Sequence, residues 1–507
     1  MITKLRKNSH ILVAVLCAAI ALISTFVPTA MGPANNSDFL RVMHPNRIYF
    51  ADENPRRMWD GYGHTAEFRM SLGTGGGLLG RGLYFLHTDF SLFNFPSSQI
   101  LPIKLSKFLN LGFNAVSGLP LATYNLFWLA LIHIAIFAYA IFLILGYIKN
   151  RFGGKIYAFS SLVAVFVLSD QGYTLYFNSF YGEGLQYVLT LLAIGLLLHL
   201  KGVRDFPKYF IVVYLMATSK FAWIPVGILF AIIPIFLYAK DSEFLRQRVL
   251  TYSGITVAAL VLFYTFLIPF WIEDYTNFNA VFNGVLRNSE TPAEDLEWLG
   301  LSPKFAVLQG FEMDMEDYPI DIFSEEFRRD FFEQISKPRI LLFYLAHPVR
   351  FFGILQESAG YARFIRAPYL TSVQNPEYAG QQEYRFSLWE KTRISVAAFG
   401  NFYFIFWILV LSTWLSVAKM ITIAKSGQGA DLRLPILLFV LTAAAAFSFV
   451  IPYISNGIAD QAKQLFGFIS LFDLIFFGLV GWVVWRVDFG EILAVVRRGF
   501  GILAGKF

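Results

Sequence analysis

Long apolar segments alternate with short polar segments along most of the chain. Several of the apolar segments approach the roughly 20 residues that cross a bilayer. This pattern predicts an all-α polytopic integral membrane protein with about ten transmembrane helices. The predicted spans are residues 11–31, 121–148, 156–170, 185–200, 209–220, 222–239, 251–272, 396–423, 435–455 and 464–485.

Two of these segments allow a second interpretation. The first follows three basic residues and resembles a signal peptide, but its apolar run exceeds the roughly 7–15 residues of a signal sequence, which favours a retained helix. Residues 209–239 could form one kinked span. The polar pair at 219–220 and Pro225 favour a tight turn between two short spans.

The charges between the spans predict the orientation. If the N-terminus is cytoplasmic, every predicted cytoplasmic loop carries several Lys or Arg residues, as the positive-inside rule requires. Both ends of the chain are then cytoplasmic. These basic segments are residues 149–155, 201–208, 240–248, 419–433 and the tail from residue 486.

Composition agrees with a membrane protein and excludes other classes. Of the 507 residues, 56% are hydrophobic and 15% are charged, against roughly 25% charged in soluble domains. The net charge of +6 lies in short loops, so it does not predict a nucleic-acid partner. Cys17 is the single cysteine, which excludes a disulfide framework and a cysteine-based metal site.

Two large loops dominate the opposite, extracytoplasmic side. We expect both loops to contain interfacial or amphipathic helices and to pack with the spans as one unit, because loops of this length are usually functional when ordered. The predicted organisation is an N-terminal transmembrane module (1–272, with a first outer loop at about 32–120), a large outer loop region (273–395), and C-terminal helices with a cytoplasmic tail (396–507).

Asp38 lies a few residues after the first span, near the outer membrane surface. There it can meet both a lipid head group and a water-soluble partner. Partial desolvation raises the pKa of a carboxyl group, which suits a general base. The simpler interpretation is a solvated boundary residue.

The rest of the first outer loop carries weaker signals. The glycine-rich stretch 71–82 lacks the Gly-Lys-Ser/Thr ending of a phosphate-binding loop, so we interpret it as a surface turn. Apolar residues at helical spacing in 97–119 predict one or two helices. These helices either lie on the membrane or pack against the spans.

The short loop 170–184 contains an aromatic cluster with a carboxylate at each end, Asp170 and Glu183. Aromatic rings offer flat faces to sugar rings, and Asn178 offers a donor and an acceptor. An interfacial aromatic belt explains the tyrosines, including Tyr181, but not the amide and the carboxylates. The loop is therefore a candidate binding wall.

In the second large loop, Asn283 and Arg287 suit a polar substrate. The acidic run 311–326 offers oxygen ligands for a divalent cation, but it lacks the spacing of a calcium-binding loop and fits a solvated face better. A divalent metal is therefore possible but not indicated.

The last outer loop places Asp460 and Lys463 one helical turn apart. The two side chains can form a local ion pair. A lysine at the membrane surface can equally bind a lipid phosphate.

This layout resembles the GT-C superfamily of membrane glycosyltransferases over the whole chain. Four stretches also resemble motifs of a bacterial family of glycan-biosynthesis hexose transferases, although the first loop is longer than in that family. They are SDFLRVM (37–43), YFNSFYGE (176–183), FNAVFNGVLRNSETPAEDLEWLGL (278–301) and ADQAKQLFGF (459–468).

The resemblance implies a reaction outside the cytoplasm, at the bacterial cytoplasmic (inner) membrane. GT-C enzymes move a sugar from a polyprenyl-phosphate donor to an acceptor glycan or lipid at the outer leaflet. Membrane lipids surround the enzyme there. The early acidic residue is their usual base, which is Asp38 here. Inversion at the anomeric carbon needs no nucleotide and no obligatory metal cofactor.

The resemblance also implies roles for the other candidates. The departing phosphate needs positive charge. Lys463 is the first candidate to supply this charge, and Arg41 and Arg287 are the next. The residues expected to line the sugar or acceptor site are Asp170, Asn178, Tyr181, Glu183, Asn283 and Arg287.

Two alternatives from other classes stay open. An O-antigen-type polymerase or ligase also has about ten spans, and the arginines of 350–366 fit its dependence on basic loop residues. A lipid-linked glycan flippase or other transporter usually carries polar residues inside the spans. Here Asp473 is such a residue, and it requires a partner.

Overall fold

The computed structural model describes residues 8–51, 63–72, 96–426 and 431–486. Within these ranges, seven helices are long and apolar enough to cross a membrane, which confirms an integral membrane protein of mainly helical fold. They are α2 (Ser9–Phe26), α7 (Phe127–Phe152), α10 (Gly182–His199), α13 (Glu243–Leu267), α20 (Phe402–Ser426), α21 (Arg433–Asn456) and α23 (Phe466–Arg486).

Three shorter apolar helices coincide with the remaining predicted spans. They are α8 (Gly154–Val163), which continues in a π-helical turn to Leu168, α11 (Phe206–Ala217) and α12 (Ile224–Leu237). Each has fewer than the roughly 20 residues that span a bilayer. The total of about ten spans therefore stays a prediction.

The break inside residues 209–239 is real. Helix α11 ends at Ala217, a short 3-10 turn follows at Phe221–Trp223, and α12 begins at Ile224. Pro225 stands in the first turn of α12, where its missing N–H costs no hydrogen bond. The Tyr209 hydroxyl donates to the Phe230 carbonyl over 2.7 Å and ties the two helices together.

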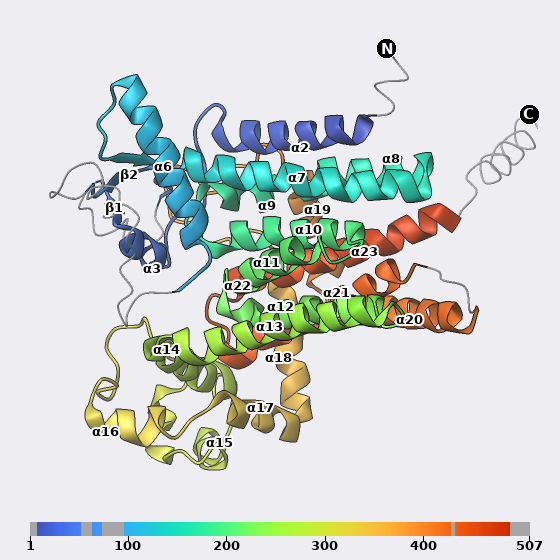
Figure 1. Cartoon of the computed structure of the whole chain (residues 1–507). Helices are drawn as coiled ribbons and strands as arrows, with labels where there is room; N and C mark the ends of the chain where they lie inside the picture. Colours follow the sequence, from blue (N-terminus) through green and yellow to red (C-terminus); the bar gives the residue numbers. More distant parts are fainter. Residues whose placement is uncertain (1–7, 52–62, 73–95, 427–430, 487–507) are drawn as a thin grey trace, which may run out of the picture.

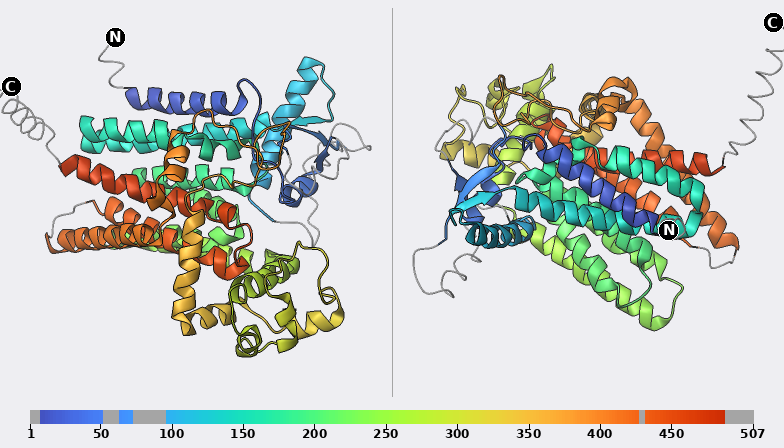
Figure 2. Two further views of the ribbon diagram at one scale, coloured as in Figure 1. Left: turned by 180° about the vertical axis from the view of Figure 1, so that it is seen from behind. Right: turned by 90° about the horizontal axis from the view of Figure 1, so that it is seen from above.

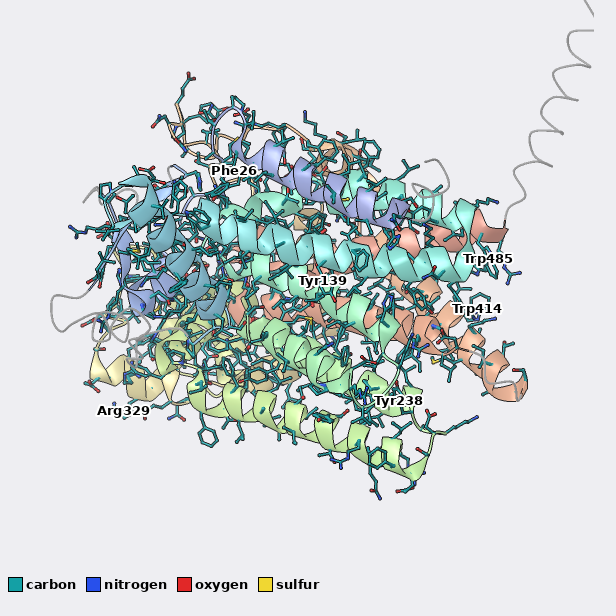
Figure 3. All side chains as sticks on the ribbon, turned by 45° about the horizontal axis from the view of Figure 1, so that its top comes forward. Phe26, Tyr139, Tyr238, Arg329, Trp414 and Trp485 are labelled. Carbon is teal, nitrogen blue, oxygen red and sulfur yellow. The ribbon has the colours of Figure 1, made fainter. Side chains whose placement is uncertain are left out.

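Burial separates central helices from peripheral ones. In α10, 78% of the apolar 18-residue segment is buried, and the helix packs against α7, α11, α21 and α23. In α20 only 17% is buried, Trp407 is exposed, and Trp414 projects from the outer face of the helix (Figure 3). A helix that is apolar on all sides and buried is central to a bundle, whereas an exposed apolar face suits contact with lipid.

The two ends of the bundle differ. Helix α2 begins and α23 ends at the same end, where Lys149 donates to the Ser9 hydroxyl over 3.1 Å and the rings of Phe152 and Trp485 lie 6.5 Å apart (Figure 1). Helices α3 (Leu40–Met43), α6 (Ile100–Ser117) and α14 (Phe270–Ala280) lie at the opposite end (Figures 1 and 2). The predicted inner and outer loops thus separate, while their assignment to the sides of a membrane stays a prediction.

The mainly helical chain also contains a small antiparallel sheet. Its strands are β1 (Ile48–Phe50), β2 (Glu67–Met70) and β3 (Thr123–Asn125), in the order β1-β2-β3. Residues 121–126, which were expected to open the second span, therefore precede α7, and β3 takes up three of them. Each strand is too short to show a period in the sequence, and Phe68 and Met70 are buried against the core.

In the described residues, both of the large loops contain helices, as predicted. Residues 97–119 form the single helix α6, which exposes Leu105, Phe108 and Val116. Most of the glycine-rich stretch 71–82 lies outside the described residues. The second loop contains α14 (Phe270–Ala280), a π-helical turn (Val281–Val285), α15 (Pro292–Trp298), α16 (Glu325–Phe327), α17 (Lys337–Ala346), α18 (Pro348–Tyr361) and α19 (Leu388–Ser395).

Candidate functional site

A cavity of about 340 Å³, termed the first cavity, lies at the end of the bundle that carries α3 and α14. Five stretches of chain that are far apart in the sequence build its wall. Its lining residues are Asn36, Ser37, Asp38, Arg41, Trp271, Ile272, Tyr275, Thr276, Glu312, Asp314, Tyr369, Asn456, Ala459, Asp460 and Gln464.

Asp38 lies in this wall between two cations. One carboxylate oxygen is 2.9 Å from the Arg41 guanidinium, and the other is 2.7 Å from Lys463 Nζ. Burial raises the pKa of the Asp38 carboxyl, but the charges of Arg41 and Lys463 outweigh burial and hold that pKa well below its usual range. The expectation that the pKa of Asp38 lies above its ordinary value is therefore wrong, because it took no account of the two cations.

Lys463 is the centre of the charged group. Its side chain is 1% exposed, and its ammonium contacts the carboxylates of Asp38 and Asp460 and donates to Asn36 Oδ1 over 3.2 Å. The ammonium also lies 5.1 Å from the centre of the Tyr181 ring, within cation–π range. Burial lowers the pKa of Lys463, but the two carboxylates outweigh it and keep that pKa well above its usual value. Lys463 is therefore charged.

Asp460 is the second acid of the cavity. The sequence offered it only as the ion-pair partner of Lys463, and that pair is confirmed. The Tyr369 hydroxyl also donates to it. Burial is the main cause that raises the pKa of the Asp460 carboxyl to about 6, with Lys463 lowering it and Asp38 raising it further. We term Asp38, Arg41, Asp460 and Lys463 the acid–lysine cluster.

Backbone strain marks the same places. Ser37, directly before Asp38, has φ 73°, and Asp460 has φ 55°. Non-glycine residues rarely adopt this left-handed conformation, and such residues concentrate at functional sites when the surrounding structure holds them. Both acids of the cluster are thus positioned by local geometry that a relaxed loop would avoid.

The loop 176–184 lies directly behind the cluster. The Tyr181 hydroxyl donates to the Ala34 carbonyl over 2.7 Å and lies 2.8 Å from Asn36 Oδ1, so it holds the segment that leads to Asp38. Glu183 is 2% exposed and pairs with Lys220 over 2.6 Å. The tyrosines of this loop are buried, which excludes an aromatic belt at the lipid surface.

Asp170 and Asn178 do not line the first cavity. The two oxygens of Asp170 accept backbone N–H groups from Gly172 at 2.9 Å and Trp389 at 2.8 Å, so the side chain caps α9 (Gln171–Thr174) and the first turn of α19. Burial and the Glu390 charge raise the pKa of Asp170 to about 7, against the effect of these hydrogen bonds. The Asn178 amide donates to the Met31 carbonyl over 2.9 Å.

Asn283 and Arg287 lie behind the opposite wall. Asn283 Nδ2 donates to Glu312 over 2.6 Å, and Glu312 lines the first cavity. Arg287 donates to Asn283 Oδ1 over 2.9 Å and pairs with Glu357 over 3.2 Å. The two predicted residues are thus joined to the cavity through a carboxylate and do not face it.

The acidic run 311–326 is more than a solvated face. Glu312 and Asp314 line the first cavity, and Asp314 accepts the Tyr275 hydroxyl over 2.5 Å. No group of three or more His, Cys, Asp or Glu side chains in the described ranges is placed to hold a metal ion.

Sequence reasoning missed the aromatic side of the cavity. Trp271, Tyr275 and Tyr369 line it, and the Arg41 guanidinium lies 5.4 Å from the Trp271 ring centre. Trp271 lies at the end of the predicted span 251–272 and Tyr275 follows that span, just as Asp38 follows the first span. A position next to a predicted span was the signal in the sequence that could have identified these aromatic residues.

The predicted partner of Asp473 is present. Asp473, buried in α23, pairs with Arg393 and accepts the Tyr173 hydroxyl and the Trp389 indole N–H, each over 2.5 Å. This ion pair lies apart from the first cavity and joins α19 to the last span.

Comparisons with known proteins give one result. No curated protein and no solved structure matches this sequence. A family model described as the YfdI N-terminal transmembrane domain matches residues 1–492. This match takes in nearly the whole chain and every residue of the acid–lysine cluster, and the chain therefore belongs to the YfdI N-terminal transmembrane domain family.

Proposed function

We propose that the protein is an inverting membrane glycosyltransferase of the GT-C type. It moves a sugar from a polyprenyl-phosphate donor to an acceptor glycan or lipid on the extracytoplasmic face. One observation carries the proposal. Asp38, Arg41 and Asp460 line one cavity at the end of an apolar helix bundle, and the buried Lys463 ammonium pairs with both carboxylates from behind the wall.

The chemistry needs these groups. A carboxylate takes the proton from the acceptor hydroxyl, and the hydroxyl oxygen forms a bond to the anomeric carbon. The bond from that carbon to the phosphate oxygen breaks, and the polyprenyl phosphate leaves with the electron pair. Fixed positive charge beside the phosphate stabilises the charge that develops there, and Arg41 and Lys463 supply it.

Asp38 is the proposed base, and its pairing sets a condition. A carboxylate held between two cations is a weak base. A donor phosphate competes with Asp38 for Arg41 and Lys463, and as the cations turn to the phosphate, the basicity of Asp38 rises. Asp460 is the competing choice, because its pKa of about 6 already lies close to neutral pH.

Most of the side chains that suggested the rival functions form ion pairs within the chain. In the basic stretch 350–366, Arg350 pairs with Asp295 over 2.7 Å and Arg366 pairs with Glu390 over 2.7 Å. These two arginines are therefore neutralised, whereas Arg363 of the same stretch is exposed. Asp473, which pointed to a transporter, is neutralised by Arg393.

The test is sugar transfer by the purified full chain in liposomes, from radiolabelled polyprenyl-phosphate sugars to a panel of acceptors. Asp38→Asn is expected to lower the rate by about 10²–10⁴-fold, the usual contribution of a general base. Asp317→Asn is the matched control. Asp317 is an exposed acid of the same outer face with φ 60°, a conformation that asparagine also tolerates.

The rates of two variants and the pH dependence of the wild-type rate show which of the two acids is the base. If Asp38 is the base, the rate of the Asp460→Asn variant stays measurable and the Asp38→Asn rate collapses. If Asp460 is the base, the wild-type rate rises as the pH passes about 6, where the Asp460 carboxyl loses its proton. Lipid-linked glycan that crosses the bilayer without sugar transfer would replace the proposal with a flippase.

A further inference from the structure

A second cavity, of about 290 Å³, lies beside the first. It is enclosed by the π-helical turn Val281–Val285, by α17 and α18, and by the last turns of α21, on the side of the bundle where α14 to α18 gather (Figure 1). Its lining residues are Gly284, Val285, Asn288, Tyr344, Arg350, Gly353, Ile354, Glu357 and Tyr453.

Two tyrosines that line this cavity have hydroxyls without partners in the described chain. Tyr344 and Tyr453 are each 1% exposed, and neither hydroxyl has a hydrogen-bond partner among the residues that the structure describes. The two rings lie 6.4 Å apart. Because an unsatisfied buried hydroxyl costs free energy, native proteins nearly always pair such groups. Two such groups in one cavity point to a ligand that accepts and donates hydrogen bonds.

The charged residues of the second cavity are already neutralised. Arg350 contacts both oxygens of Asp295 at 2.7 Å and donates to the Val285 carbonyl over 2.5 Å. Glu357 pairs with Arg287. The groups left for a ligand are two phenol hydroxyls with their ring faces and the Asn288 amide, so the chemistry favours a neutral ligand with several hydroxyls.

We propose that the second cavity binds one neutral sugar ring. Its volume is close to the lower end of the range of small-molecule pockets, roughly 300–1,000 Å³, which suits one ring better than two. Tyrosine combines a flat apolar face with a polar tip, and a sugar ring presents both kinds of surface.

A chain of four side chains connects the second cavity, and with it the proposed sugar ring, to the first cavity. Glu312 in the first cavity accepts from Asn283, Asn283 accepts from Arg287, and Arg287 pairs with Glu357 in the second cavity. The ring is therefore a non-reacting residue of the acceptor, held while its neighbour reaches the acid–lysine cluster. This acceptor role rests on the proposed function, whereas the binding of a sugar ring does not.

Binding is measured without any donor, so that it does not depend on catalysis. The probes are methyl glycosides of neutral hexoses and N-acetylhexosamines at millimolar concentration, with the methyl glycoside of a hexuronic acid as the charged counterpart. Saturation-transfer NMR on the full chain in nanodiscs reports contact between the probe and the protein. Neutral probes are expected to bind, and the charged probe is expected to bind more weakly.

Two glycines of α18 provide a matched pair of variants. A Cβ added at Gly353, which lines the second cavity, or at Gly360, which does not, meets no heavy atom within 4 Å. Leucine favours a helix at either position, so both variants are expected to fold. Gly353→Leu is expected to abolish binding, and Gly360→Leu to leave it unchanged.

The tyrosine hydroxyls are tested separately. Tyr344→Phe and Tyr453→Phe remove only oxygens that have no partner in the described chain, so the melting temperature is expected to hold. Each variant is expected to bind the neutral probes about two- to tenfold more weakly, the contribution of one hydrogen bond.

The outcomes are distinguishable. Equal binding by wild type, Gly353→Leu and both phenylalanine variants overturns the inference, and so does the absence of binding by the wild type. A protein that transfers sugar but binds no neutral glycoside refutes the second cavity alone. A protein that binds glycosides in this cavity but transfers no sugar refutes the proposed function and its acceptor role, while the sugar site stands.

Discussion

Replacing Lys463 with methionine tests the charge arrangement of the acid–lysine cluster. The substitution keeps most of the side-chain volume and removes the ammonium between Asp38 and Asp460. Asp38 then keeps Arg41 as its cation, whereas Asp460 loses its direct cation partner. Two neighbouring carboxylates are left with one cation.

The expected loss follows from burial. Removing one partner of a buried ion pair typically destabilises a protein by about 3–5 kcal/mol. Asp38 and Asp460 keep 22% and 21% of their side chains exposed, so water compensates part of the charge. We therefore expect a loss of about 3 kcal/mol for Lys463→Met at pH 8, at the lower end of that range.

The loss is expected to shrink in acid. Asp460 has a pKa of about 6 in the folded chain, above the ordinary value of 3.8, so between these values the folded state binds more protons and stability falls as the pH rises. Lys463 lowers this pKa, so its removal raises the pKa further. At pH 5 the variant then carries a protonated Asp460, and the repulsion between the acids disappears.

Cys17 provides the assay. It is the single cysteine and is fully buried in α2, so a thiol-reactive fluorophore reports unfolding in detergent. Lys304→Met is the matched control, because Lys304 also contacts two carboxylates but is 47% exposed, and its loss is expected to have little effect. An unchanged melting temperature at pH 8, or equal losses at pH 5 and pH 8, would refute the reasoning.

Three further predictions test other buried polar groups of the chain. The raised pKa of Asp170 makes the wild type less stable as the pH rises from about 4 to 7, and Asp170→Asn is expected to remove this decrease, which melting temperatures measured across that pH range report. The same variant is expected to keep the wild-type transfer rate per folded molecule in the liposome assay. Arg393→Leu is expected to cost about 3–5 kcal/mol because Asp473 stays buried without its cation, and Arg393→Leu with Asp473→Leu is expected to recover most of the melting temperature. Lys220→Met is expected to lower the melting temperature more than Glu183→Gln, because Glu183 is 2% exposed and Lys220 is 21% exposed; the reverse order would contradict this reasoning.

The sequence predicted the positions of the helices and of several residues of the site, for one physical reason. Apolar runs mark where the chain crosses the bilayer, so the polar residues beside them gather at its surfaces. Asp38 and Lys463 are 425 positions apart, and each lies next to a predicted span on the same side. Their ion pair beside the first cavity was therefore expected in outline, whereas Tyr181 and Glu183 were expected to line the site and lie behind it instead.

The partners of these residues could not be predicted, because they come from distant segments. Asp170 accepts N–H groups from a helix that lies 219 positions further along the chain. The low pKa of Asp38 depends on a lysine of the last outer loop. The left-handed backbone of Asp460 and the small sheet arise from packing and leave no periodic pattern in the sequence.

The balance of charges links donor binding to the basicity of Asp38 in the proposed reaction. The ion pairs around Asp38 and directly behind it join three acids and three bases. These are Asp38, Asp460 and Glu183 with Arg41, Lys463 and Lys220. A polyprenyl phosphate that carries a sugar adds a negative charge to this balanced set, so Arg41 and Lys463 must divide their attraction between the phosphate and the carboxylates. Asp38 therefore becomes a stronger base only when a donor is present, and the same two cations that hold it weakly basic beforehand stabilise the phosphate as it leaves.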